Sequence, residues 1–171
     1  EKLQSNLEKS AIAVLKAYEK SSQYQPAINF FKQYEGFLGD SHIALALMGA
    51  SCLHLNNSQQ AKSFLERAIQ KDSSYPEPYL LLGDLYAELQ PKIAVGYYSQ
   101  YYDSRSSIIG TRIFIKRILS LLKISKNSLN FKNLPIAFIG NFIIEPIKDF
   151  LLAECFKQSI HPQFYFGGYD Q

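Results

Sequence analysis

The side chains that could do chemistry are few in this sequence, and they are far apart. Two cysteines, Cys52 and Cys155, are separated by 103 residues, and each lies in an apolar pattern of helical spacing. Both are therefore expected to be buried thiols. None of the three histidines, His42, His54 and His161, has a Cys or His at the spacing of metal ligands. We also find no nucleophile–base pair, so we assign no catalytic residue, metal ligand or cofactor to this chain.

The composition indicates a folded chain with no bias toward nucleic acid. The 171 residues are 47% hydrophobic and 19% charged, which is ample for a core. The formal net charge is only +3, and no run of five Lys or Arg residues occurs, so we expect no nucleic acid partner.

Two observations favour a cytoplasmic protein without a membrane span. The N-terminal residues are polar and lack the apolar region of a signal peptide. The longest apolar stretch, 108–124, is interrupted by Arg112, Lys116, Arg117 and Lys123, so it is too short and too charged to cross a membrane. The oligomeric state stays open.

An interval of 34 residues recurs along the first part of the chain. One set of residues at this interval is Leu15, Gly49 and Gly83, and another is Tyr18, Cys52 and Tyr86. Ala27, Ala61 and Val95 form a third set at the same interval, and Ala94 lies one residue before Val95. Phe31 and Leu65 form a fourth set. Small residues let neighbouring helices approach, and large ones fill the space between them. The pattern predicts helices at 2–20, 24–37, 41–55, 58–71, 77–89 and 92–103.

The repeat resembles the tetratricopeptide (TPR) family. Tyr79-x-x-Leu82-Gly83-x-x-Tyr86 is similar to the first helix of a TPR, and Ala61-x-x-x-Leu65-x-x-Ala68 to the second helix of the preceding one. The resemblance implies a mainly α fold, in which residues 1–124 form an α-solenoid of three helix pairs.

Two segments near the end of the predicted solenoid leave a choice of interpretation. Residues 108–124 fit a capping helix, which a stack of repeats needs, although a basic apolar helix also suits a membrane surface. Four tyrosines fit packing between repeats, although they also suit a platform for stacking bases. They are Tyr97, Tyr98, Tyr101 and Tyr102.

In TPR proteins the first helices of the repeats line a concave face that commonly binds a peptide or helix. By the 34-residue register, the partner-binding residues are Lys9, Lys16, Lys20, Ile43, Ala50, Leu53, His54, Glu77, Asp84 and Glu88. Ile12, Glu19, Ala46, Leu80 and Ala87 share that face. It grades from basic through apolar to acidic. A solvated helix face explains the charges but leaves the apolar middle unexplained, and such surfaces usually mark interfaces.

The composition changes after residue 124, where 125–133 is predicted to be a linker. A strand is then expected at 135–142, a helix from Pro146 to near Ile160, and a second strand at 164–166. This β-α-β order opens a doubly wound sheet. Because two strands and one helix cannot make an independent domain, we expect the protein to continue past Gln171.

The last segment also resembles a known family. The phrase IAFIGNF-x-x-EP-x-x-x-FL, followed by FYFGGYDQ, makes 134–171 similar to the N-terminal domain of FkbH-like proteins of the haloacid dehalogenase superfamily, subfamily IIIC. The resemblance implies an SGNH-hydrolase-like or flavodoxin-like α/β domain, here partial. It also implies a phosphatase-like domain outside this chain, carrying an Asp-x-Asp motif and magnesium. Such proteins load glyceryl units onto an acyl carrier protein in polyketide biosynthesis.

Within this resemblance, Gly140, Asn141 and Phe142 follow the first strand, where ligands and anions bind in such sheets. They form a candidate ligand loop, although a tight strand-to-helix turn explains them too. SGNH hydrolases carry a nucleophilic Ser where this sequence has Phe142, so we expect no hydrolysis at this loop. Asp170 alone, without partner residues, is not assigned a catalytic role.

Three functions fit these patterns. The first is a protein-interaction region of a larger FkbH-like protein, with a protein or peptide partner and an acyl carrier protein as the candidate. The second is a direct contribution to acyl or phosphoryl transfer through the Gly140 loop. The third is a TPR scaffold unrelated to carrier chemistry.

Overall fold

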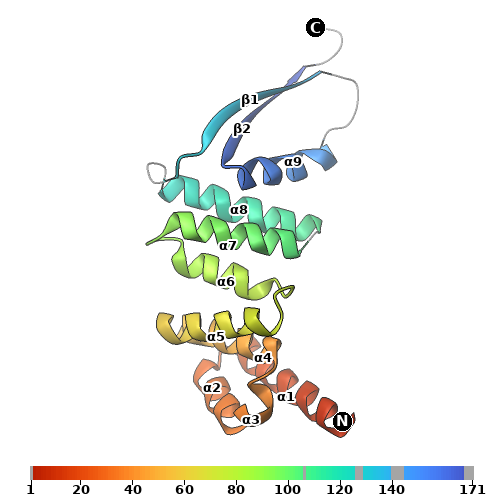
Figure 1. Cartoon of the computed structure of the whole chain (residues 1–171), viewed down its shortest axis with the longest axis vertical. Helices are drawn as coiled ribbons and strands as arrows, with labels where there is room; N and C mark the ends of the chain where they lie inside the picture. Colours follow the sequence, from red (N-terminus) through yellow and green to blue (C-terminus); the bar gives the residue numbers. More distant parts are fainter. Residues whose placement is uncertain (1, 106, 126–128, 140–144, 168–171) are drawn as a thin grey trace. The chain divides into compact units, whose positions relative to one another are not determined.

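The computed structural model of the chain describes all residues except 1, 106, 126–128, 140–144 and 168–171 (Figure 1). The helices are α1 Lys2–Lys20, α2 Tyr24–Gln33, α3 Glu35–Leu38, α4 His42–His54, α5 Ser58–Lys71, α6 Glu77–Tyr86, α7 Pro91–Ser104, α8 Ile108–Ile124 and α9 Glu145–Lys157. The strands are β1 Lys132–Ile139 and β2 Ile160–Gly167. The chain forms two compact units, residues 1–85 and residues 86–171, and each is described by itself.

The first unit is built from helix pairs, as the 34-residue interval predicts. α4 and α5 pack closely, and Gly49 makes this possible. A Cβ atom at Gly49 would lie 2.5 Å from the Cδ2 atom of Leu65 and 3.4 Å from the carbonyl oxygen of Ala61. At the start of α5, the side chain of Asn57 accepts a hydrogen bond from the backbone N–H of Gln60 at 3.3 Å, which caps the helix.

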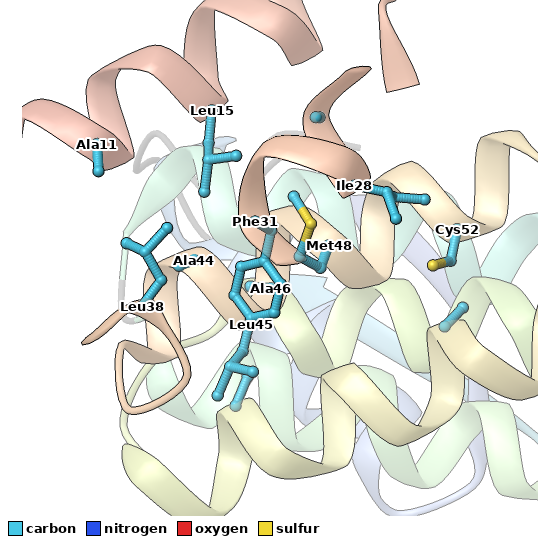
Figure 2. Close-up of a cluster of buried hydrophobic side chains, with 13 residues drawn as sticks. Ala11, Leu15, Ile28, Phe31, Leu38, Ala44, Leu45, Ala46, Met48 and Cys52 are labelled. Atoms are coloured by element: carbon cyan, nitrogen blue, oxygen red, sulfur yellow. The ribbon is translucent and has the colours of Figure 1, made fainter. Parts of the chain in front are cut away.

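The core of the first unit gathers side chains from several helices at the repeat positions (Figure 2). Leu15 from α1 and Phe31 from α2 are each 1% exposed, and Leu45 and Met48 from α4 are fully buried. The predicted positions Leu15, Ala27, Phe31, Ala61 and Leu65 are interior, because one face of each helix turns toward its neighbours, whereas Tyr18 and Tyr86 are only partly buried.

Two helix ends differ from the prediction. The helix expected at 24–37 stops at Gln33, and the single turn α3 follows it. Tyr34 lies between them with φ −116° and ψ 18°, outside the helical region. The helix expected at 77–89 stops at Tyr86, and Leu89 is 85% exposed in the turn that follows.

In the second unit, α7 carries the small-residue position of the repeat one residue early. Ala94, one residue early in the register, is fully buried, while Val95 is only partly buried. The tyrosines of α7 pack inside the unit, as the packing interpretation expected. Tyr98 and Tyr101 are each 1% exposed, and Tyr97 stacks on Tyr86 with ring centroids 5.7 Å apart.

α8 lies against α7 and α9 (Figure 1). Ser107 caps it, because its Oγ atom accepts a hydrogen bond from the N–H of Gly110 at 3.0 Å. The buried face of α8 carries Phe114, Ile118 and Leu121. Within the described residues, α8 included, the structure contains no helix with the length and apolar character of a membrane span.

The last part of the second unit is a parallel β-α-β segment, in which β1 pairs with β2 from Lys132 and Ile160 onward. β1 begins at Lys132, inside the predicted linker 125–133, because the backbone N–H of Lys132 donates to the carbonyl of Ser159 at 2.9 Å. α9 ends at Lys157, and Ser159 then turns the chain with a φ of 55°. The division between the two units falls inside the third predicted helix pair, so the domain limits at 124 and 134 remain a prediction.

Candidate functional site

A groove lies among α1, α4, α6 and the loop before α6, all within residues 1–85. Its volume is about 400 Å³. We call it the helix groove; it is lined by Lys16, Glu19, Ala46, Leu47, Ala50, Tyr75, Glu77, Leu80 and Leu81. Its lining is mainly apolar, and three charged side chains accompany it.

Two alanines form the floor of the helix groove. Ala46 and Ala50 are one turn apart on α4 and are 4% and 7% exposed. Their methyl groups leave open the space that larger side chains would fill. Leu47, Leu80 and Leu81 are partly buried and add further apolar surface. A contiguous apolar hollow of this kind is typical of a binding site.

The loop before α6 brings Tyr75 to the helix groove. The ring of His42 meets Tyr75 edge-on, with centroids 4.9 Å apart, and its Nε2 atom lies 3.6 Å from Asp72 Oδ2. Hydrogen bonds from Ser74 hold the pKa of Asp72 below its ordinary value. Tyr79 Oη donates to the carbonyl of Ser73 at 2.9 Å, so the loop is fixed at both ends.

Charged side chains lie beside the apolar floor. Lys16 and Glu19 come from α1, and Lys16 is exposed to solvent. Glu77 is the first residue of α6, where the helix dipole favours a carboxylate. The groove therefore offers both signs of charge around an apolar middle.

The structure gathers some of the predicted face and leaves other members elsewhere. Of the ten residues predicted to bind a partner, three line the helix groove: Lys16, Ala50 and Glu77. Glu19, Ala46 and Leu80, assigned to the same face, line it too. The other predicted residues are Lys9, Lys20, Ile43, Leu53, His54, Asp84 and Glu88, and they are not part of its lining. Their role in binding remains a prediction.

Three of these outlying residues have surroundings that explain their position. Leu53 packs against the hydrophobic core, so an Asp there would disturb folding as well as any contact. His54 stacks on Tyr24 of α2, with centroids 4.2 Å apart. Glu88 follows the end of α6 in the second compact unit.

Sequence reasoning missed three lining residues. Leu47 and Leu81 are themselves 34 residues apart, so the repeat register could have found them beside Ala46 and Leu80. Tyr75 lies between helices, where a helical register assigns no position. Only its packing on His42 reveals it.

Gly140, Asn141 and Phe142, and also Asp170, lie outside the residues that the structure describes. Within the described part of the chain, no three His, Cys, Asp or Glu side chains are grouped to hold a metal ion. Cys52 and Cys155 are free and buried as predicted, and burial raises the pKa of each thiol.

Comparisons with known proteins identify the fold. No protein-family model matches the chain, and no curated protein matches it in sequence. Among solved structures, it is similar to a mutant of the O-GlcNAc transferase from Thermobaculum terrenum, with a TM-score of 0.57 and 13% sequence identity. The similarity covers 95% of this chain and 41% of the transferase chain, so this chain spans less than half of that protein. The helical part has a TPR-like repeat fold.

In this TPR-like repeat, α1 and α4 are the first helices of successive pairs, and α6 follows them along the chain. All three contribute to the helix groove, which overlaps part of the face that the 34-residue register assigned to a partner. At 13% identity the similarity concerns the fold alone.

Proposed function

We propose that residues 1–85 are a protein-binding module that holds an apolar peptide or helix of a partner in the helix groove. The observation that supports this most strongly is the alanine floor at Ala46 and Ala50 beside Leu47, Leu80 and Leu81. A helix laid into an apolar groove binds through a few buried anchors, and small floor residues make room for them.

The charges beside the groove would orient the partner. Lys16 on α1 is exposed and favours an acidic side chain of the partner beside the apolar floor. Exposed ion pairs contribute little affinity, typically below about 1 kcal/mol each. They therefore determine the orientation of the bound partner more than the strength of binding.

The test uses a peptide selected by display on the full chain. Ala50→Leu fills the floor and is expected to weaken binding of that peptide at least roughly tenfold, because its anchor loses its space. Ala13→Leu is the matched control, since Ala13 is exposed on α1 and is not part of the groove lining.

Binding that survives Ala50→Leu, measured beside an unchanged thermal midpoint, would refute the groove as the binding site. If Ala50→Leu lowers the midpoint, Lys16→Glu provides a second measurement, with the exposed Lys32→Glu of α2 as its control. The proposal is contradicted if the selected peptide binds both groove variants with the same affinity as the wild type.

We further propose that the module serves a larger FkbH-like protein in the cytoplasm and recruits an acyl carrier protein for glyceryl or acyl transfer. Two observations support this: the resemblance of 134–171 to that family, and the parallel β-α-β order of β1, α9 and β2. Titration with a phosphopantetheine-bearing acyl carrier protein tests it. If the acyl carrier protein does not bind while the display peptide still does, the carrier role is rejected. The proposal that residues 1–85 are a protein-binding module is then unaffected.

A further inference from the structure

The outward face of α8 is basic and apolar. The sequence of α8 contains no Asp or Glu, and four of its residues are Lys or Arg. Arg112, Lys116 and Lys123 are exposed along one side, and Leu119 between them is 37% exposed. The opposite side is buried in the second unit. This outward face is therefore a charged surface with an apolar centre.

Two hollows run along this face and share lining residues. One, of about 340 Å³, is lined by Arg112, Ile115, Lys116, Leu119, Ser120, Lys123 and Asp149. The other, of about 500 Å³, is lined by Leu119, Leu122, Lys123, Leu129, Phe131, Asn133 and His161. Leu119 and Lys123 border both hollows, so the two are neighbours on this face, and together we call them the α8 channel.

Among the described residues, the charge of the α8 channel is only partly compensated. Arg112 Nε lies 3.1 Å from Asp149 Oδ2 on α9. Among the residues that the structure describes, Lys116 and Lys123 form no ion pair. The channel therefore presents two lysines that favour carboxylates.

We infer that the α8 channel docks an acidic amphipathic helix of a partner protein. Lys116 and Lys123 are seven residues apart, or about 10.5 Å along α8. A helix lying beside α8 would meet them with carboxylates at positions i and i+7. An apolar residue at i+3 or i+4 would then face Leu119 and enter the hollow lined by Leu122 and Phe131.

The concave shape favours a helix over a membrane surface. A helix that lies on a membrane presents its broadest apolar face to the lipid. In α8 that face carries Phe114, Ile118 and Leu121, which are buried inside the unit. The exposed side has basic residues around a hollow that a flat bilayer cannot enter. This site is separate from the helix groove and does not rest on the function proposed for residues 1–85.

The test measures binding of a labelled helical peptide to the full chain by fluorescence anisotropy. The peptide carries Glu at i and i+7 and Leu at i+3 and i+4. Lys116→Glu combined with Lys123→Glu should weaken binding at least roughly tenfold, because two favourable pairs become repulsive. A peptide with Lys at i and i+7 should bind this double variant better than it binds the wild type. Leu119→Ser should weaken both interactions without changing the charge.

Lys32→Glu combined with Lys92→Glu is the matched control, because it makes the same change of charge on exposed lysines of α2 and α7 outside the α8 channel. Equal loss in this control, or no rescue by the charge-reversed peptide, overturns the inference, because the attraction would then be non-specific. A chain that binds vesicles of phosphatidylcholine and phosphatidylglycerol through Lys116 and Lys123 but does not bind the acidic peptide overturns it in favour of a lipid surface. Circular dichroism confirms that each variant is folded.

Discussion

Residues 1–85 and residues 86–171 bury their apolar side chains in different ways. In the first unit, helices adjacent in sequence pack on each other, as α4 does on α5. In the second unit, strands β1 and β2 pair residues 28 positions apart in the sequence, such as Lys132 with Ile160. The local arrangement repeats at fixed spacing, whereas the parallel pair requires a crossover helix to bring its strands together.

The exposed apolar side chains reflect the same difference. Phe166 and Tyr165 on β2 are 51% and 57% exposed, and Ile147 on α9 is 57% exposed. Parallel sheets are usually covered on both faces, so these side chains mark surface that another layer would normally bury. In the repeats, each helix packs directly on the next one. The core side chains of Leu15 and Leu65 are therefore almost fully buried.

The largest expected effect is in the second unit, at Phe156. This side chain is fully buried on α9, and its ring lies 6.1 Å from that of Phe131 and 6.0 Å from that of His161. Phe156→Ala should lower the free energy of unfolding by about 4 kcal/mol because it leaves a cavity. Phe150→Ala, on the same helix but 40% exposed, should cost much less.

Hydrogen exchange in the Phe156→Ala variant also tests whether the two units hold separate cores. Protection should fall across 86–171 and persist in α4 and α5. Equal loss in α4 and α5 would show that the chain unfolds as one body and would remove the distinction between the units.

A smaller effect separates two helical glycines, one from each unit. Gly49→Ala should destabilise the first unit by about 1–3 kcal/mol, because the new Cβ atom would lie 2.5 Å from Leu65. Gly96 on α7 has no atom within 4 Å of such a Cβ, so Gly96→Ala should stabilise by up to about 1 kcal/mol. Thermal melting compares the two, and a Gly49→Ala midpoint at or above the wild-type value would contradict the close packing of α4 on α5.

The smallest expected effect is a change in alkaline stability of the second unit. Burial, assisted by a hydrogen bond to Glu154, raises the pKa of Tyr102 from 10.0 to about 12. The folded chain therefore retains a proton that the unfolded chain releases, so this contribution to stability is complete below pH 10 and is lost as the pH rises through 12. Tyr102→Phe should flatten the fall in unfolding free energy over that range relative to wild type. An unchanged slope would mean that Tyr102 is not held in its neutral form.

The helices could be predicted because their signals are local. The 34-residue interval places Leu15, Gly49 and Gly83 in equivalent turns, and Ala94 occupies the small-residue position one residue early. The end of α6 at Tyr86 was not predictable in this way, because the helical pattern continues through Ala87 and Glu88. The break between α2 and α3 at Tyr34 was missed too, because the spacing of apolar residues does not mark a single non-helical residue.

The candidate site could be predicted only in part. The register identified Lys16, Ala50 and Glu77, because each lies on a helix that the register predicts to be the first of a pair. It also included Leu53, which packs against the core, because a helix face in a stack has no sharp edge between core and surface. The register could not predict Tyr75. Its position in the loop depends on packing against His42, which no periodic pattern encodes.

The most direct test of the helix groove is a methyl nuclear magnetic resonance titration of the full chain with the display-selected peptide. The methyl signals of Leu47, Leu80 and Leu81 line the groove and should shift together at one affinity. Leu55 and Leu89, exposed outside its lining, should keep their positions. Shifts confined to Leu55, Leu89 or the α8 residues Leu119 and Leu122, with the groove signals unmoved, would contradict the central claim that residues 1–85 bind a partner through the helix groove.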